Sequence, residues 1–293
     1  MKLGIPLGWP DDPEAIGAAV TALAVRCDEA GLDSLWTADH LFQIPVTGLP
    51  RESPMLEGYA TIAFLAGQTR RIRLGVMVTC AVYRHPGMLL KAVTTLDVLS
   101  GGRIDFAVGA GWDVEEATAL GIPFPPRAER FEHLEDVLRI AHRMWSGDES
   151  PFEGAHHRLA RPLNSPPARQ RPHPPILVAG GGERKTLRMV AEYADACNLF
   201  DLPAPYGVDI PHKLAVLRHH CEALGRDPAE IEVTAMTSYP VGGRSALLAR
   251  IGELAAMGVD HVIVMAPSFE WGDAALDVVC GLADEVHAIV PAA

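Results

Sequence analysis

The sequence predicts an α/β fold of the (β/α)8 type, a TIM barrel with insertion loops. Short apolar runs of β type alternate with longer helical patterns along the whole chain, and eight such pairs can be counted. The strand-like runs are almost continuously apolar, as in parallel strands that helices cover. A length of 293 residues suits one such barrel, so we expect a single domain over residues 1–293.

The first four pairs open the expected barrel. Their strand-like runs read "KLGIPLG", "LDSLWTA", "IRLGVMVT" and "RIDFAVG". The helical patterns that follow them cover Pro13–Ala30, Glu57–Thr69, Pro86–Leu99 and Arg130–Trp145. Gly31, in "EAGLD", stands where a glycine ends a helix just before a strand begins.

The last four pairs complete it. Their strand-like runs read "PPILVAG", "DACNLF", "IEVTAMT" and "DHVIVMA", and the helical patterns cover Glu183–Tyr193, Val208–Leu224, Ser245–Met257 and Trp271–Ile289. The same alternation fits a doubly wound open sheet, but eight pairs in this length favour a closed barrel.

Two connections are longer than the usual loops of a barrel. The segment His40–Leu56 follows the second strand, so it belongs to the C-terminal face, where TIM barrels carry their active sites. The segment Gly147–Pro175 joins a helix to a strand, so it starts from the opposite face unless it climbs the barrel wall.

Composition excludes several classes of protein. A formal net charge of −12 opposes binding to the phosphate backbone, so no nucleic-acid partner is expected. The N-terminus is no secretory signal, and no apolar run approaches membrane-spanning length, so no membrane partner is expected either. Five scattered cysteines indicate neither a disulfide framework nor a zinc cluster, which points to a reducing cytoplasm.

Two glycine-rich turns follow neighbouring strands. Gly109, Ala110, Gly111 and Trp112 follow the fourth strand, and the run from Ala179 through Gly180 and Gly181 to Gly182 follows the fifth. Glycine lets backbone N–H groups approach an anion, and the helix after Gly182 adds its positive N-terminal end. Each turn alone could be an ordinary tight connection, and neither matches a nucleotide P-loop or a dinucleotide fingerprint. The pair therefore indicates a phosphate of some other cofactor.

Polar side chains gather after the second and third strands. Asp39 and His40 follow the second strand, and histidine can exchange a proton near neutral pH. Equally, Asp39 could cap the next segment and His40 could be a structural polar group. Thr79, Tyr83, Arg84 and His85 add groups suited to a planar, anionic ligand after the third strand. No spacing typical of zinc ligands occurs, so no metal site is expected.

Five segments together carry a resemblance to a known family: "GLDSLWTADHLF", "RIRLGVMVTCAVYRHP", "TTLDVLSGGRIDFAVGAGW", "GIPFPPRAERFEHLEDVLRIAHRMW" and "PPILVAGGGERKTLRMVAEYADACNLF". The chain resembles the luciferase-like monooxygenase superfamily from about residue 2 to 200, and within it the deazaflavin-dependent oxidoreductases. The resemblance implies a TIM barrel that binds coenzyme F420, or alternatively reduced FMN, at the C-terminal ends of its strands.

The resemblance also implies roles for particular residues. Asp39 and His40 correspond to a pair beside the reactive ring, with His40 the proton donor. Met77 and Val78 correspond to a strand bulge that often holds a non-prolyl cis peptide behind the ring, and Thr79 follows them. The two glycine turns correspond to the phosphate side of the cofactor, with Trp112 as a wall of the pocket.

Two positions depart from the sugar-phosphate dehydrogenases of this group. Trp112 replaces a glutamate that acts there as an acid, and Ile44 replaces a tryptophan, so sugar-phosphate oxidation is not expected. We expect hydride transfer between a deazaflavin and a small organic substrate, in the reducing direction, by a cytoplasmic homodimer. An FMN-dependent monooxygenase and a non-catalytic cofactor-binding protein remain the alternatives.

Overall fold

The chain forms a closed parallel barrel in a computed structural model that describes residues 1–44, 47–266 and 268–292. The strands are β1 (Lys2–Pro6), β2 (Ser34–Thr37), β3 (Arg73–Val76), β4 (Thr79–Cys80), β5 (Ile104–Gly109), β8 (Ile176–Ala179), β9 (Ala196–Asp201), β10 (Glu232–Ser238) and β11 (His261–Met265). They lie in the order β3-β2-β1-β11-β10-β9-β8-β5, and pairing of β3 with β5 closes the ring. The short β4 follows β3 and pairs with the end of β5. The barrel expectation is confirmed, and the open-sheet alternative is wrong.

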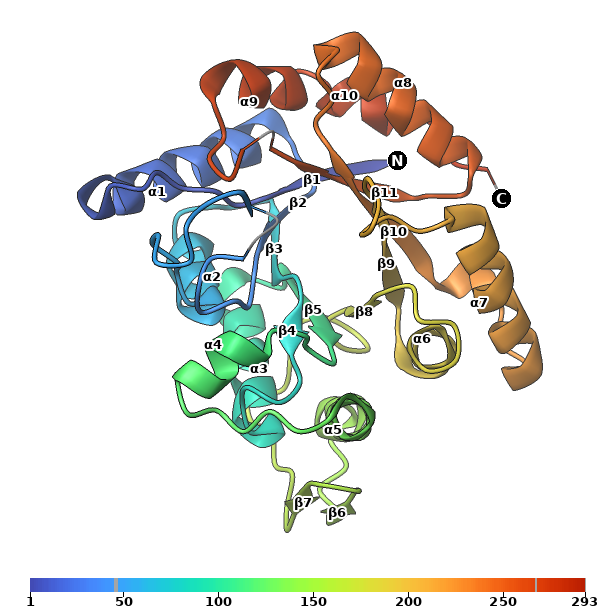
Figure 1. Cartoon of the computed structure of the whole chain (residues 1–293). Coiled ribbons are helices and arrows are strands. Elements are labelled where there is room, and N and C mark those ends of the chain that lie inside the picture. Colours follow the sequence, from blue (N-terminus) through green and yellow to red (C-terminus); the bar gives the residue numbers. More distant parts are fainter. Residues whose placement is uncertain (45–46, 267, 293) are drawn as a thin grey trace.

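Helices surround this ring (Figure 1). They are α1 (Pro13–Ala30), α2 (Gly58–Ala66), α3 (Pro86–Ser100), α4 (Val114–Ala119), α5 (Arg127–Ser146), α6 (Thr186–Tyr193), α7 (Ile210–Leu224), α8 (Gly243–Ala256), α9 (Asp273–Cys280) and α10 (Ala283–His287), with a 3-10 turn at Pro228–Glu230. Gly31 adopts a left-handed conformation with φ of 81° and ends α1, as expected of a glycine C-cap. None of the helices in the described ranges is both long and apolar enough to cross a membrane.

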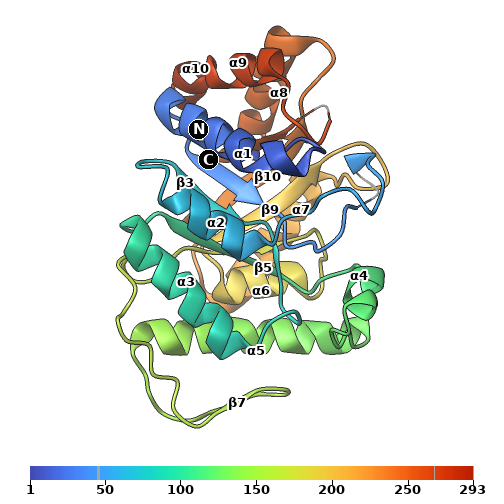
Figure 2. The ribbon, with the colours of Figure 1, turned by 90° about the vertical axis from the view of Figure 1, so that its left-hand side faces the viewer.

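Two helical expectations need correction. The helix expected over Trp271–Ile289 is two short helices, α9 and α10, which meet at Gly281, where glycine's low helix propensity favours a break. The helix α4 was not expected at all. Asp113 caps it by accepting hydrogen bonds from the backbone N–H groups of Glu115 and Glu116. A capping residue followed by acidic residues is a sequence signal for the start of a helix, so this helix could have been predicted. Figure 2 shows α4 on the same side of the barrel as the loop after β2.

The insertion between α5 and β8 runs along the outer wall of the barrel. It contains the hairpin of β6 (Phe152–Glu153) and β7 (Arg158–Leu159), which lies outside α5 in Figure 1. The buried carboxylate of Asp136, on α5, accepts hydrogen bonds from the backbone N–H groups of Ala155, His156 and His157 at the hairpin turn. These bonds hold the turn against the wall of the barrel.

The barrel interior is filled around one tryptophan. Trp36 on β2 is buried and packs with Ala107, Leu177 and Ile263 from other strands. Its indole N–H donates to the hydroxyl of Ser34 at 2.8 Å. Gly75 on the adjacent β3 makes room for this ring, because a Cβ at that position would come within 2.7 Å of its Cε3 atom.

We therefore expect Gly75→Ala to lower the free energy of unfolding by about 1–3 kcal/mol, since overpacking displaces neighbouring side chains. Equilibrium denaturation with urea measures this difference. Gly17→Ala is the matched control, because Gly17 lies in α1 with no atom near the position of the added Cβ. That control should be neutral or stabilising by up to about 1 kcal/mol. Equal stability of Gly75→Ala and wild type would show that the barrel core is loosely packed.

Candidate active site

A carboxylate and an imidazole meet at the C-terminal mouth of the barrel. His40 follows β2, and its Nδ1 atom lies 2.7 Å from Oε1 of Glu116 on α4. The other oxygen of Glu116 accepts from the backbone N–H groups of Leu41 at 2.8 Å and Phe42 at 3.1 Å. The hydroxyl of Tyr83 donates to Oε1 at 2.6 Å. The buried carboxylate thus fixes both the histidine ring and the backbone beside it.

These bonds determine the protonation of Glu116. Burial alone raises the pKa of a carboxyl group, but the hydrogen bonds from His40 and Tyr83 outweigh it and lower the pKa of Glu116 to about 2. The ionised carboxylate accepts a hydrogen bond from Nδ1–H of His40, which leaves Nε2 as the atom that can gain or lose a proton. Within the described part of the chain, Nε2 makes no hydrogen bond.

A pH experiment tests this assignment. The folded-state pKa of Glu116 lies below its ordinary value of 4.5, so its contribution to stability is present above pH 4.5 and is lost as pH falls towards about 2. We expect wild-type protein to lose up to about 1.4 kcal/mol more stability per pH unit below 4.5 than Glu116→Gln does. Urea denaturation of both proteins between pH 3 and 7 measures the difference. Parallel stability curves would mean that Glu116 is not held ionised.

Asp39 lies in a second, separate network. Both of its oxygens accept hydrogen bonds from the guanidinium of Arg84 at 2.8 Å, and one also accepts from the backbone N–H of Cys80. Burial raises the pKa of Asp39, and Arg84 opposes this effect. Arg84 also pairs with Glu57 and lies over the ring of Tyr59. Asp39 therefore does not cap the segment after it, but joins the loop after β2 to the loop after β4.

The remaining predicted residues around β4 and β5 are close to these networks. The Met77–Val78 peptide is cis, as the resemblance implied, and both side chains pack on the apolar cluster inside the barrel. Thr79 is buried, and its hydroxyl lies 2.7 Å from that of Tyr59. The ring of Trp112 meets that of His40 edge to face, with centroids 5.2 Å apart, and 60% of the residue is exposed.

Gly109, the last residue of β5, and Gly111, two residues later, allow close packing of that turn. A Cβ on Gly109 would lie 3.1 Å from Cγ2 of Val78, and one on Gly111, which has a φ of 74°, would collide with the sulfur of Cys80. The carbonyl of Ala110 accepts a hydrogen bond from Arg130. The side of these glycines that faces Val78 and Cys80 is therefore filled by protein.

The turn after β8 is more open. Ala179 packs on the apolar cluster at the end of the barrel, and the N–H of Gly180 donates to the carbonyl of Asn198. In the described ranges, the backbone N–H groups of Gly181 and Gly182 make no hydrogen bond to protein, and the first turn of α6 has no side-chain cap. Open N–H groups in the turn that leads into a helix are suited to an anion. Because β5 and β8 pair directly, both glycine-rich turns lie at one edge of the mouth, as expected.

Two of the functional candidates were missed in the sequence. In the sequence, no motif separates Glu116 from its acidic neighbours Asp113 and Glu115. The signal was the helix start at Asp113, which places Glu116 on the side of α4 that faces His40. Arg84 was noticed as a loop cation, but its bidentate contact with Asp39 depends on the fold.

His40, Asp113 and Glu116 are close enough to suggest a metal site. Their lone pairs are better accounted for by the hydrogen bonds already present. Both oxygens of Asp113 accept from Arg51, at 2.7 and 2.8 Å, and both oxygens of Glu116 are engaged as described above. The carboxylate oxygens are therefore already engaged in hydrogen bonds, and we assign no metal to this group.

Comparisons with known proteins agree with this architecture. The family model of luciferase-like monooxygenases matches residues 6–260, and the chain belongs to that family. It is 31% identical over 237 residues to an F420-dependent glucose-6-phosphate dehydrogenase of Kineococcus radiotolerans, covering 78% of this chain and 66% of that protein. The chain thus spans slightly less than two thirds of the dehydrogenase.

The fold also occurs in solved structures of other proteins. An F420-dependent secondary alcohol dehydrogenase in complex with an F420-acetone adduct superposes with a TM-score of 0.80 at 16% identity, covering 97% of this chain and 98% of that one. Riboflavin lyase with modified FMN and riboflavin superposes with a TM-score of 0.69 at 17% identity, covering 88% and 68%. At these identities, the superpositions establish a shared barrel.

Proposed function

We propose that the protein is an oxidoreductase that transfers a hydride between coenzyme F420 and a small organic substrate. The observation that carries the proposal is the His40–Glu116 pair at the barrel mouth, because it leaves one imidazole nitrogen free for proton transfer. The family membership and the F420-dependent relative add support. The departures at Trp112 and Ile44 argue for a substrate other than a sugar phosphate.

Residues at the mouth would hold the cofactor. The apolar surface of Met77, Val78 and Ala179 suits one face of a planar ring, and Trp112 with His40 suits an edge of the pocket. The unbonded N–H groups of Gly181 and Gly182 suit the phosphate. The buried Oδ1 atom of Asn198 lacks a hydrogen-bond partner in the described residues, and this is consistent with a polar ligand group.

The chain's own groups have distinct tasks in this proposal. Glu116 orients His40, and Nε2 of His40 donates the proton that accompanies hydride delivery to a carbonyl-like substrate, or accepts one in the reverse direction. The ion pair of Asp39 with Arg84 holds the His40 backbone in place. The hydride chemistry itself is supplied by the cofactor when it is bound.

A fluorescence titration with F420 and with FMN tests the proposal first. We expect tighter binding of F420 and hydride transfer that oxygen does not affect. A deazaflavin that lacks the phosphate arm should bind at least tenfold more weakly if the glycine turn holds the phosphate. Oxygen uptake that depends on reduced FMN, without F420 binding, would instead support the monooxygenase alternative. Cofactor binding without turnover on a broad substrate panel would support a carrier.

This ligand comparison is a cleaner test of the glycine turn than a substitution in it. A Cβ on Gly181 would lie 3.0 Å from Cγ1 of Val208 and 3.3 Å from Cε of Lys213. Gly181→Val would therefore press on the segment leading to α7, and weaker cofactor binding would not report an anion contact alone.

The homodimer also remains part of the proposal. The helix α3 exposes Met88 and Leu99 by 72% and 78%, and α2 exposes Phe64 by 48%. Large apolar side chains on neighbouring outer helices are consistent with a subunit interface. Light scattering coupled to size-exclusion chromatography would measure the mass of the assembly directly.

A further inference from the structure

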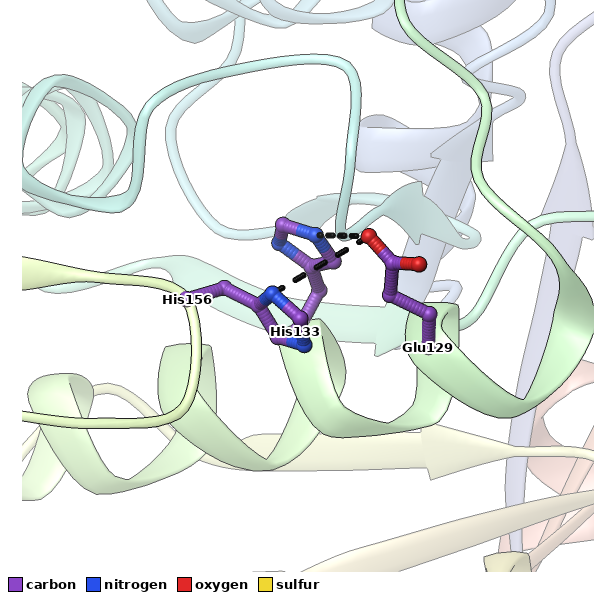
Figure 3. A group of neighbouring side chains, drawn as sticks. All are labelled: Glu129, His133 and His156. Atoms are coloured by element: carbon purple, nitrogen blue, oxygen red, sulfur yellow. Dashed lines mark ion pairs between the residues drawn. The ribbon is translucent and has the colours of Figure 1, made fainter.

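A second polar cluster lies on α5 and the β6–β7 hairpin, outside the hydrogen-bonded network of His40 and Glu116. Glu129 and His133 are four residues apart on α5, so they share one face of that helix. The turn of the β6–β7 hairpin brings His156 over the same face (Figure 3). The rings of His133 and His156 stack with centroids 4.2 Å apart, and both turn a nitrogen towards the carboxylate of Glu129.

The three side chains present their donor atoms to one point. Nε2 of His133 lies 3.9 Å from Oε1 of Glu129, and Nδ1 of His156 lies 4.0 Å from the same oxygen. All three donor atoms lie within 4.8 Å of one another. An ion equidistant from the three atoms would be roughly 2.2–2.5 Å from each, close to the Zn–N distance of about 2.0–2.1 Å. Because the two rings are stacked with only 15° between their planes, one imidazole must also turn on binding, so that its in-plane lone pair meets the ion.

Both imidazoles have a supporting partner on their other nitrogen. Nε2 of His156 lies 2.8 Å from Oε2 of Glu132, and Nδ1 of His133 lies 3.0 Å from Nε2 of His157. Histidines that bind a metal characteristically donate their second N–H to a carboxylate or another acceptor, which fixes the tautomer and turns the free lone pair towards the ion. Here the two supported nitrogens leave the other two, Nε2 of His133 and Nδ1 of His156, on the side of Glu129.

The backbone of the hairpin turn is anchored independently of any ion. The carboxylate of Asp136 accepts hydrogen bonds from the N–H groups of Ala155, His156 and His157. These bonds place the imidazole of His156 against α5 without help from the ligands themselves. An arrangement held in this way loses little conformational freedom on binding.

From this arrangement, we propose that Glu129, His133 and His156 bind one divalent transition-metal ion, with Zn²⁺ the most suitable. Two imidazoles and one carboxylate are a ligand set that zinc accepts, whereas Mg²⁺ and Ca²⁺ prefer oxygen ligands only. Glu129 and His133 also line a cavity of about 610 Å³, together with Tyr83 and Arg84. The fourth coordination position is open to water or to an anionic group of a small molecule in that cavity.

This proposal revises the expectation that the chain has no metal site. The sequence contains none of the short zinc spacings, because the donors come from a helix and from a hairpin more than twenty residues further on. His85, which is close to His157, is not part of the ligand set, since its Nδ1 accepts a hydrogen bond from Gly87 at the start of α3.

Zinc titration of the metal-free full-length protein tests the site, with a chromogenic chelator as competitor. We expect one equivalent to bind, and His133→Ala and His156→Ala each to weaken binding at least tenfold. Glu132→Gln should weaken it by about 10-fold or more, because it removes the supporting carboxylate of His156. His219→Ala is the matched control, since the imidazole of His219 is 80% exposed on α7. The zinc affinity of this variant should equal that of wild type.

Circular dichroism of each variant without metal shows whether it folds, and Co²⁺ in place of zinc should give the visible absorption of a four-coordinate ion. Equal zinc affinity in wild type and in the His133→Ala/His156→Ala double variant would overturn the proposal, as would the lack of a one-to-one complex. The F420 titration is a separate measurement on separate residues. Failure of either proposal is therefore distinguishable from failure of the other.

Discussion

His40→Ala is expected to lower turnover by about 10²–10⁴-fold, the usual loss when a positioned proton donor is removed. The fold and most of the cofactor affinity should persist, because affinity in the proposed site comes from ring burial and phosphate contacts elsewhere. Steady-state kinetics, with a substrate identified on wild-type protein, measures kcat, and fluorescence titration measures cofactor binding. The variant should therefore have a much lower kcat and a nearly unchanged cofactor affinity.

A second variant distinguishes proton transfer from hydrogen bonding. His40→Gln keeps a side chain that can hydrogen-bond to Glu116 but cannot exchange a proton near neutral pH. If proton transfer is the role of His40, His40→Gln should be nearly as slow as His40→Ala. His219→Ala is the control for loss of an exposed imidazole. A wild-type turnover rate in His40→Ala would show that His40 only lines the pocket and transfers no proton.

Asp39→Ala is expected to lower the free energy of unfolding by about 3–5 kcal/mol, because it leaves the guanidinium of Arg84 without its main partner in a largely buried setting. Asp39 is only 4% exposed, and both of its oxygens are bonded to Arg84. Glu57 would remain as a partner of Arg84, so the loss should lie towards the lower end of this range. Denaturation with urea measures the change.

The matched control is an ion pair on the surface. Glu285→Ala removes the partner of Arg244 in a pair whose side chains are 48% and 46% exposed, and it should cost no more than about 1 kcal/mol. The double variant Asp39→Ala/Arg84→Met should recover part of the lost stability, since it removes the unpaired charge as well. A loss below about 1 kcal/mol in Asp39→Ala would mean that water reaches Arg84 freely.

Much of the site could be placed from the sequence because parallel strands end at one face. Asp39, His40, Thr79 and the two glycine turns all follow strands, so a barrel necessarily brings them to its C-terminal face. The sequence could not predict which of these side chains bond to one another within that face. Asp39 and His40 are adjacent in the chain, yet one bonds to Arg84 and the other to Glu116, because successive residues point in different directions.

The sequence by itself determined the order of the eight barrel strands and of the main helices between them, since hydrophobic periodicity and glycine caps are local signals that each segment carries independently of its neighbours. It also determined which strand ends carry polar and glycine-rich turns. Only the tertiary structure decided that α4 delivers Glu116 to His40, and that the hairpin delivers His156 to Glu129 and His133. These contacts join residues 23 to 76 positions apart in the chain. Barrel closure and the path of the insertion bring such residues together, and no local pattern encodes either of them.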